Sequence, residues 1–483
     1  MLLFIALQLN LKDIDLLLLI ESCAIIVYIL ERMYTINNKG DFVARYPFLS
    51  RLLLLTGNMF LAAFSMWLAV QVVNHRFSFV LNTDMYWRML PLNVVVVCLS
   101  FGVYDLYSLA KKRYGEIFIG IALSVFYTFI AIMAASFLFR EFSFSRSVLL
   151  ITAVLELILM NAWQYGWWRL ERYLDEPKNA LLLGSDKECQ RVLARLQAAP
   201  QMNYNVRKIM SQDVEKQEWL QTLPQVDLVI ICQDISLKKK AAIVMQCQQM
   251  DKKVVLVPSV YELFCSGLEI NKIDDMPFFQ PQYLNPSLER RSLKRLFDIF
   301  FSLFALSITF VPMALSAVLI KLDSKGPVFY RQIRTGRYGE EFAVFKFRSM
   351  RQDAEASSGP VMAGEDDPRI TRIGHILRAM RLDELPQFIN VLRGDMSIVG
   401  PRPERPFFVN QFQAEIPEYR FRHNVRPGIT GMAQVYGKYN TTAYDKLVYD
   451  LMYVQKCDFF TDLVIIIQTV RVLFQKSSTE GVK

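Results

Sequence analysis

The stretch LFDIFFSLFALSITFVPMALSAVLI, residues 296–320, is long enough to cross a bilayer and is interrupted once, at Pro312. Basic residues precede it (Arg290, Arg291, Lys294, Arg295) and follow it (Lys321, Lys325, Arg331, Arg334, Arg337). A spanning helix would place one basic cluster outside the cell, against the positive-inside tendency. A proline within a helix removes a backbone donor and bends it. We therefore expect a helix over about 292–322 that enters the membrane, bends at Pro312 and returns to the same face; an ordinary kinked span is the alternative.

Four earlier apolar segments are also long enough to span a bilayer. They cover about 51–73, 87–110, 116–139 and 147–168. A shorter run at 16–30, within 13–34, carries Glu21 and is a candidate fifth helix, in the membrane or at its surface. It has no basic start or small-residue cleavage site, so a cleavable signal peptide is not expected. The sequence therefore predicts a transmembrane bundle of four helices, or five, over 1–175.

Charge sets the orientation of this bundle and limits the partners. The basic strings KKRYGE (111–116) and WWRLERYL (167–174) favour the cytoplasmic side, so everything after about residue 170 faces the cytoplasm. The seven cysteines are scattered without metal-ligand spacing, as expected for reduced thiols in that compartment. A net charge of +9 suits anionic lipid, phosphorylated substrates or nucleic acid. Because the apolar segments favour a membrane and no nucleic-acid motif is recognisable, no nucleic-acid partner is expected.

Residues 176–285 alternate between short apolar runs and helical patterns. NALLLGS, VDLVIICQ and KVVLVPS are rich in strand-forming residues, and KECQRVLARLQ and KKKAAIVMQCQQM separate them. This alternation predicts a small Rossmann-like α/β module in the cytoplasm. Its first turn, GSDKEC, has one glycine where the dinucleotide fingerprint needs three. We therefore favour a structural or regulatory module over a nucleotide-binding one.

Residues 286–483 are dense in side chains that suit phosphate, and they predict a mixed α/β catalytic domain. Lys346 and Arg348 have the spacing of one strand face, and Arg378 and Arg381 that of one helix face. Prolines hold Arg402 in GPRP (400–403), and VRPGITG (425–431) repeats this arrangement with Arg426. Any one of these arginines is most simply a solvated charge. Their convergence is more informative, because each guanidinium can form two parallel hydrogen bonds to the oxygens of a phosphate.

Two adjacent acids, Asp383 and Glu384, lie in RLDELPQF (381–388) among these arginines. Pro386 suits the first turn of a helix and Gly394 its end, so the acids should lie at a helix N-terminus, where simple capping would account for them. The alternative uses the same geometry. A carboxylate kept ionised by the helix end can attack phosphorus, and its neighbour can hold Mg²⁺, which binds one or two carboxylates together with substrate phosphates.

From about Lys294 to Val482 the chain resembles the monotopic phosphoglycosyl transferases, also called bacterial sugar transferases. The resemblance rests on KRLFDIFFS, GPVFYRQIRTG, FKFRSM, LRAMRLDELPQFINVLRGDMSIVGPRP and VRPGITGMAQVYGKYN, in this order. The preceding helices and degenerate Rossmann-like module are similar to those of the large subgroup, the polyprenyl-phosphate hexose-1-phosphate transferases. Members of that subgroup start capsule or exopolysaccharide repeat units at the cytoplasmic face of the bacterial inner membrane.

The resemblance implies a two-step reaction. Asp383 would attack the β-phosphate of a UDP-sugar, release UMP and hold the sugar phosphate covalently, and undecaprenyl phosphate would then accept it. Glu384 matches the Mg²⁺-associated acid, and Pro312 matches the break in the re-entrant helix. The expected phosphate and nucleotide contacts are Lys346, Arg348, Arg378, Arg381, Pro401, Arg402, Arg426 and Lys438.

Two positions depart from the pattern of some small members: Val311 replaces a serine and Lys438 replaces an arginine. The second departure removes a guanidinium fork from one expected nucleotide contact. Two other functions remain open. One is a glycosyltransferase that releases UDP, supported only by the acid pair at 366–367, and the other is a non-catalytic scaffold. The sequence leaves open the sugar and a homo-oligomeric state.

Overall fold

The structure is a computed structural model, and it describes residues 47–77, 84–139, 145–211, 216–265, 269–281, 284–351, 367–437 and 441–473. The chain forms two compact units, Met1–Val257 and Pro258–Lys483. The candidate helix within 13–34 and the predicted contact Lys438 lie outside the described residues. The predicted domain boundaries at 175 and 285 remain predictions.

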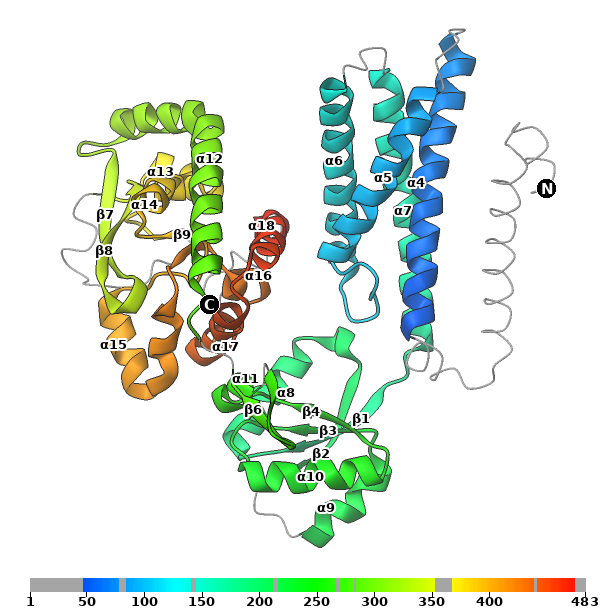
Figure 1. The fold of residues 1–483 in the computed structure, drawn as a ribbon, viewed down its shortest axis with the longest axis vertical. Helices are drawn as coiled ribbons and strands as arrows, with labels where there is room; N and C mark the ends of the chain where they lie inside the picture. The colour runs from blue at the N-terminus through cyan, green and yellow to red at the C-terminus, as the bar shows by residue number, and fades with distance from the viewer. Residues whose placement is uncertain are drawn as a thin grey trace. The chain divides into compact units, whose positions relative to one another are not determined.

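The first unit begins with long apolar helices that lie side by side (Figure 1). They are α4 (Pro47–Phe77), α5 (Asp84–Val103), α6 (Tyr114–Leu138) and α7 (Arg146–Leu174). Each is long and apolar enough to cross a membrane, which is compatible with the predicted bundle. One boundary was wrong: α5 ends at Val103 and not near residue 110. Asp105 adopts a left-handed conformation (φ 51°), and Leu106 and Leu109 of the following turn are fully buried.

The first unit continues with a four-stranded parallel sheet, of order β2-β1-β3-β4. Its elements are β1 (Lys178–Leu183), α8 (Asp186–Gln197), η1 (Pro200–Met202), β2 (Tyr204–Met210), α9 (Lys216–Thr222), η2 (Leu223–Gln225), β3 (Leu228–Ile231), α10 (Leu237–Gln249) and β4 (Lys253–Leu256). Leu181 and Leu183 belong to one core, and Ala180 and Leu182 to another. Because alternate residues of a strand face opposite sides, both faces of this sheet are covered, as the α/β prediction requires.

The second unit combines helices with three two-stranded sheets. It starts with α11 (Val260–Cys265), β5 (Glu269–Ile273), β6 (Met276–Gln280), α12 (Leu288–Asp323), β7 (Phe329–Thr335), η3 (Arg337–Gly339), β8 (Glu341–Phe347) and α13 (Arg372–Ala379). It continues with η4 (Leu382–Glu384), α14 (Gln387–Arg393), β9 (Ser397–Val399), α15 (Pro406–Glu415), η5 (Pro417–Asn424), β10 (Gly428–Thr430), α16 (Met432–Tyr436), α17 (Ala443–Lys456) and α18 (Phe459–Leu473).

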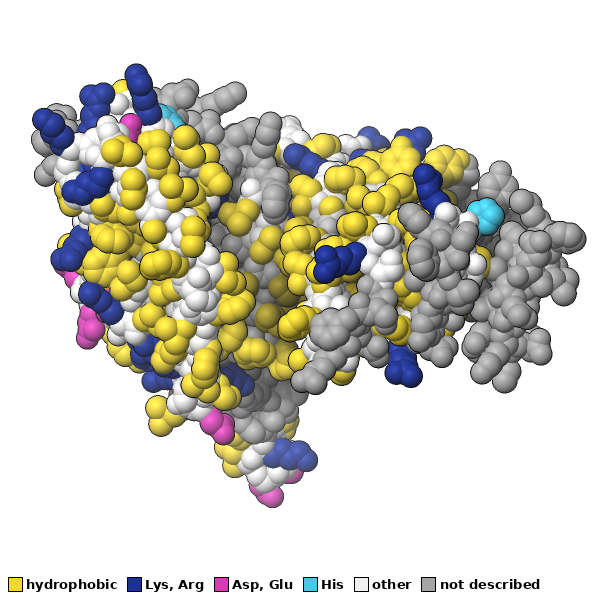
Figure 2. Space-filling model, turned by 90° about the horizontal axis from the view of Figure 1, so that it is seen from above, with side chains coloured by type: hydrophobic (Ala, Val, Ile, Leu, Met, Phe, Trp, Pro, Cys, Tyr) yellow, Lys and Arg dark blue, Asp and Glu magenta, His cyan; other side chains and the backbone are white. Residues whose placement is uncertain are grey.

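The helix α12 contains the stretch around Pro312 and is drawn as two limbs joined by a sharp bend (Figure 1). Large apolar side chains on both limbs are exposed, among them Phe300 (64%), Val311 (72%) and Leu322 (79%). Seen from above, hydrophobic side chains cover this part of the second unit and Lys and Arg lie at its margin (Figure 2). A large exposed apolar surface of this kind suits lipid contact.

Both limbs of α12 are tied to the same unit. At the start of the helix, Arg295 donates to the carbonyl oxygens of Val391 (2.5 Å) and Leu392 (2.9 Å), the last residues of α14. Past its end, Arg348 donates to the carbonyl oxygens of Ser324 (2.7 Å) and Lys325 (2.9 Å). The two ends of the apolar helix are therefore anchored on one folded body.

Two buried polar side chains fix the elements around the acid pair. The Asn390 amide of α14 donates to Ala343 O (2.7 Å) and accepts from Phe345 N (2.9 Å), which joins α14 to β8. Asp298 of α12 accepts from the hydroxyl of Ser397 (3.0 Å) and joins that helix to β9. A buried polar group that loses its hydrogen-bond partner destabilises the fold, so these bonds hold each element in its position.

Candidate active site

The acid pair lies in a short 3₁₀ turn, η4, directly before α14. The backbone before it is unusual, because Arg381 has a left-handed conformation (φ 54°), which side chains other than glycine rarely adopt. Gly394 ends α14 with φ 96°, as the sequence predicts. The acid pair therefore precedes the N-terminus of α14, which begins at Gln387 with Pro386 directly before it.

Glu384 lies between two cations. Its Oε1 accepts from Lys346 Nζ of β8 (2.8 Å) and from a terminal nitrogen of Arg402 (2.9 Å). Burial alone would raise the pKa of Glu384, but Arg402 and Lys346 outweigh it and hold the pKa well below its usual value. Glu384 is therefore ionised at neutral pH. Three residues that the sequence singles out separately are brought together at one carboxylate oxygen.

Asp383 differs from its neighbour. Burial and the charge of Glu384 raise its pKa above the ordinary value, and Lys346, Arg378 and Arg402 offset this only in part. The pKa is raised and not lowered because burial and the adjacent charge of Glu384 exceed the effect of the nearby cations. That Asp383 is ionised at neutral pH stays a prediction.

Arg402 is held in place from behind. Arg422 donates to the Arg402 carbonyl oxygen (3.0 Å) and forms a buried ion pair with Asp450 (2.7 Å). Arg334 of β7 donates to Pro403 O (3.1 Å) and pairs with Glu404 (3.7 Å). Burial lowers the pKa of Arg334 to about 10, and Arg402 contributes to this shift. Sequence reasoning did not separate Arg334 from the other arginines of its strand, and only the contact with GPRP singles it out.

Two other expected contacts lie elsewhere or in another geometry. Strand β8 ends at Phe347, so Arg348 is not on the strand face of Lys346; it is 5% exposed and binds the backbone past α12. Helix α13 ends at Ala379, so Arg378 and Arg381 do not share a helix face. Arg378 still lies close enough to Asp383 to lower its pKa.

The loops GPRP and VRPG lie side by side because β9 and β10 pair in parallel. The approach is close: a Cβ atom at Gly400 would lie 2.3 Å from the carbonyl oxygen of Arg426, so only glycine fits. Pro401 O accepts from Gly428 N (3.0 Å) and Pro401 is buried, so it shapes the turn. The Arg426 side chain, however, lines a separate pocket away from the acid pair.

No cluster of three or more His, Cys, Asp or Glu side chains that could hold a metal is found among the described residues. The acid pair itself still fits Mg²⁺, which needs only one or two carboxylates when substrate phosphates and waters complete its shell. Within the described part of the chain, Glu384 Oε1 holds both cation contacts and Oε2 has none. Glu384 therefore offers an ionised hard oxygen beside Asp383.

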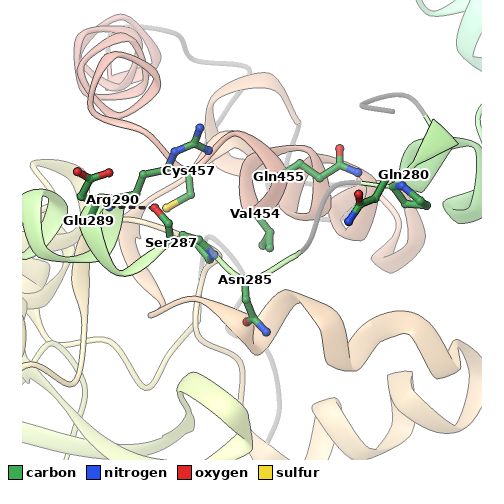
Figure 3. Close-up of a pocket in the computed structure, with 10 residues that line it drawn as sticks. Gln280, Asn285, Ser287, Glu289, Arg290, Val454, Gln455 and Cys457 are labelled. Carbon is green, nitrogen blue, oxygen red and sulfur yellow. Dashed lines mark hydrogen bonds between the residues drawn. The ribbon is translucent and has the colours of Figure 1, made fainter. Parts of the chain in front are cut away.

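A pocket of about 300 Å³ opens at the start of α12, away from Asp383 and Glu384. Figure 3 shows its residues: Gln280 ends β6, Ser287 and Arg290 lie at the start of α12, and Gln455 and Cys457 lie at the end of α17. The Ser287 hydroxyl accepts from the Arg290 backbone N–H (3.3 Å), an ordinary helix cap. This pocket is therefore not the site of the acid pair.

Comparison with known proteins gives two family matches. A family described as "Bacterial sugar transferase" matches residues 289–476, and one described as "CoA-binding domain" matches 99–244. A protein of Rhizobium leguminosarum bv. phaseoli, "Exopolysaccharide production protein PSS", is 45% identical over 186 residues, 37% of this chain and 93% of the relative. The chain therefore belongs to the bacterial sugar transferase family. The matched region contains the mixed α/β domain and its carboxylate pair.

Two longer relatives also match part of the chain. The "UDP-N-acetylgalactosamine-undecaprenyl-phosphate N-acetylgalactosaminephosphotransferase" of Aeromonas hydrophila is 44% identical over 205 residues, 42% of this chain and 48% of the relative. The "UDP-glucose:undecaprenyl-phosphate glucose-1-phosphate transferase" of Escherichia coli (strain K12) is 37% identical over 246 residues, 50% of this chain and 52% of the relative. The chain thus matches about half the length of these two relatives.

Proposed function

We propose that this protein transfers a sugar 1-phosphate from a UDP-sugar to undecaprenyl phosphate at the cytoplasmic face of the bacterial inner membrane, and so initiates an exopolysaccharide, capsule or other glycoconjugate. The observation that carries the proposal is the adjacent carboxylate pair, in which Lys346 and Arg402 hold Glu384 at 2.8 and 2.9 Å. Family membership and the names of the relatives support the reaction class.

In the first step, an Asp383 carboxylate oxygen attacks the phosphorus that carries the sugar. The bond from this phosphorus to the bridging oxygen breaks, UMP leaves with the electron pair, and an acyl phosphate remains. In the second step, a phosphate oxygen of undecaprenyl phosphate attacks the same phosphorus and Asp383 leaves. Lys346 and Arg402 would stabilise the charge on the phosphate oxygens, as preorganised cations do at phosphoryl groups.

Glu384, with Asp383 beside it, would hold Mg²⁺, and Arg378 lies near enough to assist at the phosphate. The ion would neutralise charge on the diphosphate oxygens. This role is tested by measuring UMP release as a function of Mg²⁺ concentration, for the wild type and for Glu384→Gln.

The helix α12 would enter the bilayer and leave it on the same side. Its support is that Arg295 before the bend and Arg348 after it bind the same folded unit, with exposed apolar side chains between them. A helix that spanned the membrane would separate these two arginines by about 30 Å of hydrocarbon. The cytoplasmic orientation rests on the basic strings of the sequence.

The decisive experiment incubates the purified full chain with a panel of UDP-sugars and undecaprenyl phosphate and measures the nucleotide released. We expect UMP, and a covalent sugar phosphate on the wild type but not on Asp383→Asn. A matched control is Asp274→Asn, the same chemical change in the exposed turn between β5 and β6, where φ is 57° and asparagine is tolerated. Release of UDP would overturn the proposal in favour of a glycosyltransferase.

Full polysaccharide production by Asp383→Asn in cells that lack the wild-type protein would instead favour a scaffold.

A further inference from the structure

A second pocket, of about 430 Å³, lies between the first limb of α12 and the loops that carry Arg337 and Arg426. Neither Asp383 nor Glu384 lines it. Its basic residues are Arg291, Lys294, Arg295, Arg337 and Arg426, and Asp298 is the acid that lines it. Five cations around one carboxylate make a cavity that favours an anion.

Three of the charged side chains that line this pocket already have partners within the protein. Lys294 is paired with Asp462 (2.5 Å), and Asp298 is 1% exposed and bonded to Ser397. Arg295 is engaged by the backbone oxygens at the end of α14. None of these contacts supplies a counter-ion for Arg337 or Arg426.

Arg426 and Arg291 have the least support of the five. No hydrogen bond or ion pair to the Arg426 guanidinium is found within the described residues. Burial lowers its pKa, Arg295 and Arg337 lower it further, and Asp298 offsets this only in part. Arg337 donates to Asn424 O (3.4 Å) and Tyr338 Oη (2.8 Å), which are neutral groups. A half-buried arginine among like charges gains free energy from a bound anion.

The rim of the pocket is apolar and continues onto the surface of α12. Leu288, Leu296 and Ile299 line the cavity, and Leu288 and Leu296 are 80% and 54% exposed. Phe300 and Phe304, one turn and two turns further along the helix, are also exposed. A basic cavity that opens onto an exposed apolar helix matches an amphiphile with a phosphate head and a hydrocarbon tail.

We propose that this pocket, with Arg337 and Arg426 as its anion-binding side chains, holds the phosphate group of a membrane lipid while the lipid tail lies along the first limb of α12. Two sources carry this chemistry: an anionic phospholipid and a polyprenyl phosphate. A free nucleotide or inorganic phosphate would make no use of the apolar rim. The proposal concerns binding and does not depend on the proposed reaction.

The test uses the purified full chain in a neutral detergent and compares Arg426→Gln and Arg337→Gln with the wild type. The matched control is Arg420→Gln, an exposed arginine of the same unit that does not line the pocket. Phosphatidylglycerol, undecaprenyl phosphate, phosphatidylcholine and inorganic phosphate are titrated separately. The readouts are the rise in unfolding temperature and the mass of retained lipid, so inactivity of the enzyme would not affect them.

We expect at least one of the two anionic lipids to stabilise the wild type and Arg420→Gln, and phosphatidylcholine to have little effect. The lipid that acts identifies the source. In Arg426→Gln the apparent affinity should fall roughly tenfold, the loss expected for one charge-assisted contact. Without lipid this variant should unfold no earlier than the wild type, because Arg426 has no described hydrogen bond to lose, and this separates lost binding from misfolding.

Three results would overturn the proposal. One is an equal response of Arg426→Gln and the wild type to each lipid. Another is stabilisation by inorganic phosphate at the same concentrations as the lipids, which would make the apolar rim irrelevant. The third is the absence of any response in the wild type.

Discussion

Asp383 and Glu384 are neighbours in sequence, yet their surroundings push their pKa values in opposite directions. Glu384 accepts from Lys346 and Arg402, whereas Asp383 is half-buried beside the charge of Glu384 and has no ion pair among the described residues. A carboxylate with a raised pKa is a stronger base, and hence a better nucleophile, once it is ionised. Such a separation of pKa values fits the proposed roles, with Glu384 as the charged acid and Asp383 as the nucleophile.

The first prediction concerns the pH dependence of adduct formation. Asp383 reacts as the carboxylate, so the rate should fall as pH decreases through its raised pKa, at a higher pH than for an ordinary aspartate. Lys346→Met removes a cation that lowers this pKa, so the acid limb should move to still higher pH. The Lys346→Met substitution should also lower turnover roughly a hundredfold, as expected for the loss of one preorganised charge. Single-turnover rates across pH measure both effects.

Stability should depend on pH in the opposite way at the two acids. The depressed pKa of Glu384 contributes stability above the ordinary glutamate range, and this is lost as pH falls through the folded-state value. The raised pKa of Asp383 costs stability while it is ionised, and this cost disappears as pH falls through its own folded-state value. For the first prediction, an acid limb of adduct formation that lies at the same pH in Lys346→Met as in the wild type would contradict the role of Asp383 as the titrating group.

The second prediction concerns the buried pair behind Arg402. Arg422 is 4% exposed and Asp450 is 1% exposed. Asp450→Asn leaves the guanidinium without its counter-charge, so we expect a loss of about 3–5 kcal/mol in the free energy of unfolding. Denaturant unfolding measures it. The double variant Arg422→Met with Asp450→Leu should recover stability but not activity, because the bond to the Arg402 carbonyl is lost.

At the scale of elements, α12 carries the apolar surface through which the second unit would meet the membrane. Its two limbs carry exposed apolar side chains, and arginines before and after the bend hold it to α14 and to the chain after β8. A proline leaves the carbonyl four residues earlier without its helical donor, so Pro312 offers a local cause for the bend in α12. Membrane entry and return in α12 would thus be encoded by a single residue type at one position.

The third prediction follows for the topology of α12. Cysteines introduced at Ser292 and Lys325, both exposed, should react with a membrane-impermeant maleimide from the same side of inverted vesicles. The unmodified chain corrects for its own thiols. Pro312→Ala restores the backbone donor, so we expect a straighter helix and a loss of activity of at least about tenfold, because the acid pair then shifts relative to the bilayer. Labelling of the two cysteines from opposite sides would contradict the re-entrant helix.

At the scale of the whole molecule, the role of the α/β module of the first unit is the open question. The family that matches residues 99–244 is described as a CoA-binding domain. In this chain the sheet of the module is parallel and covered on both faces. At the turn after β1, however, Asp234 accepts from the Ser185 N–H (2.7 Å), and a Cβ atom at Gly184 would lie 2.6 Å from that of Cys232. The N–H group that would meet a phosphate already faces a carboxylate.

The fourth prediction is therefore that coenzyme A and NAD leave the unfolding temperature of the full chain unchanged at millimolar concentration. An incoming phosphate would have to displace Asp234 and would meet a like charge. Differential scanning fluorimetry measures the shift, and Asp234→Ala is the informative variant because it frees the N–H group. A clear stabilisation of the wild type by either cofactor would show that the turn can open.

The sequence by itself determined the apolar helices, the strands β1, β3 and β4 and the end of α14 at Gly394, because hydrophobic periodicity and glycine act locally. It also singled out Lys346, Glu384 and Arg402 by residue type. It could not decide which cations meet which carboxylate, since Lys346 and Glu384 are 38 residues apart and join only when β8 packs beside η4. Tertiary structure alone gave Arg348 and Arg426 their surroundings and raised the pKa of Asp383, because burial and long-range charge depend on how the elements pack.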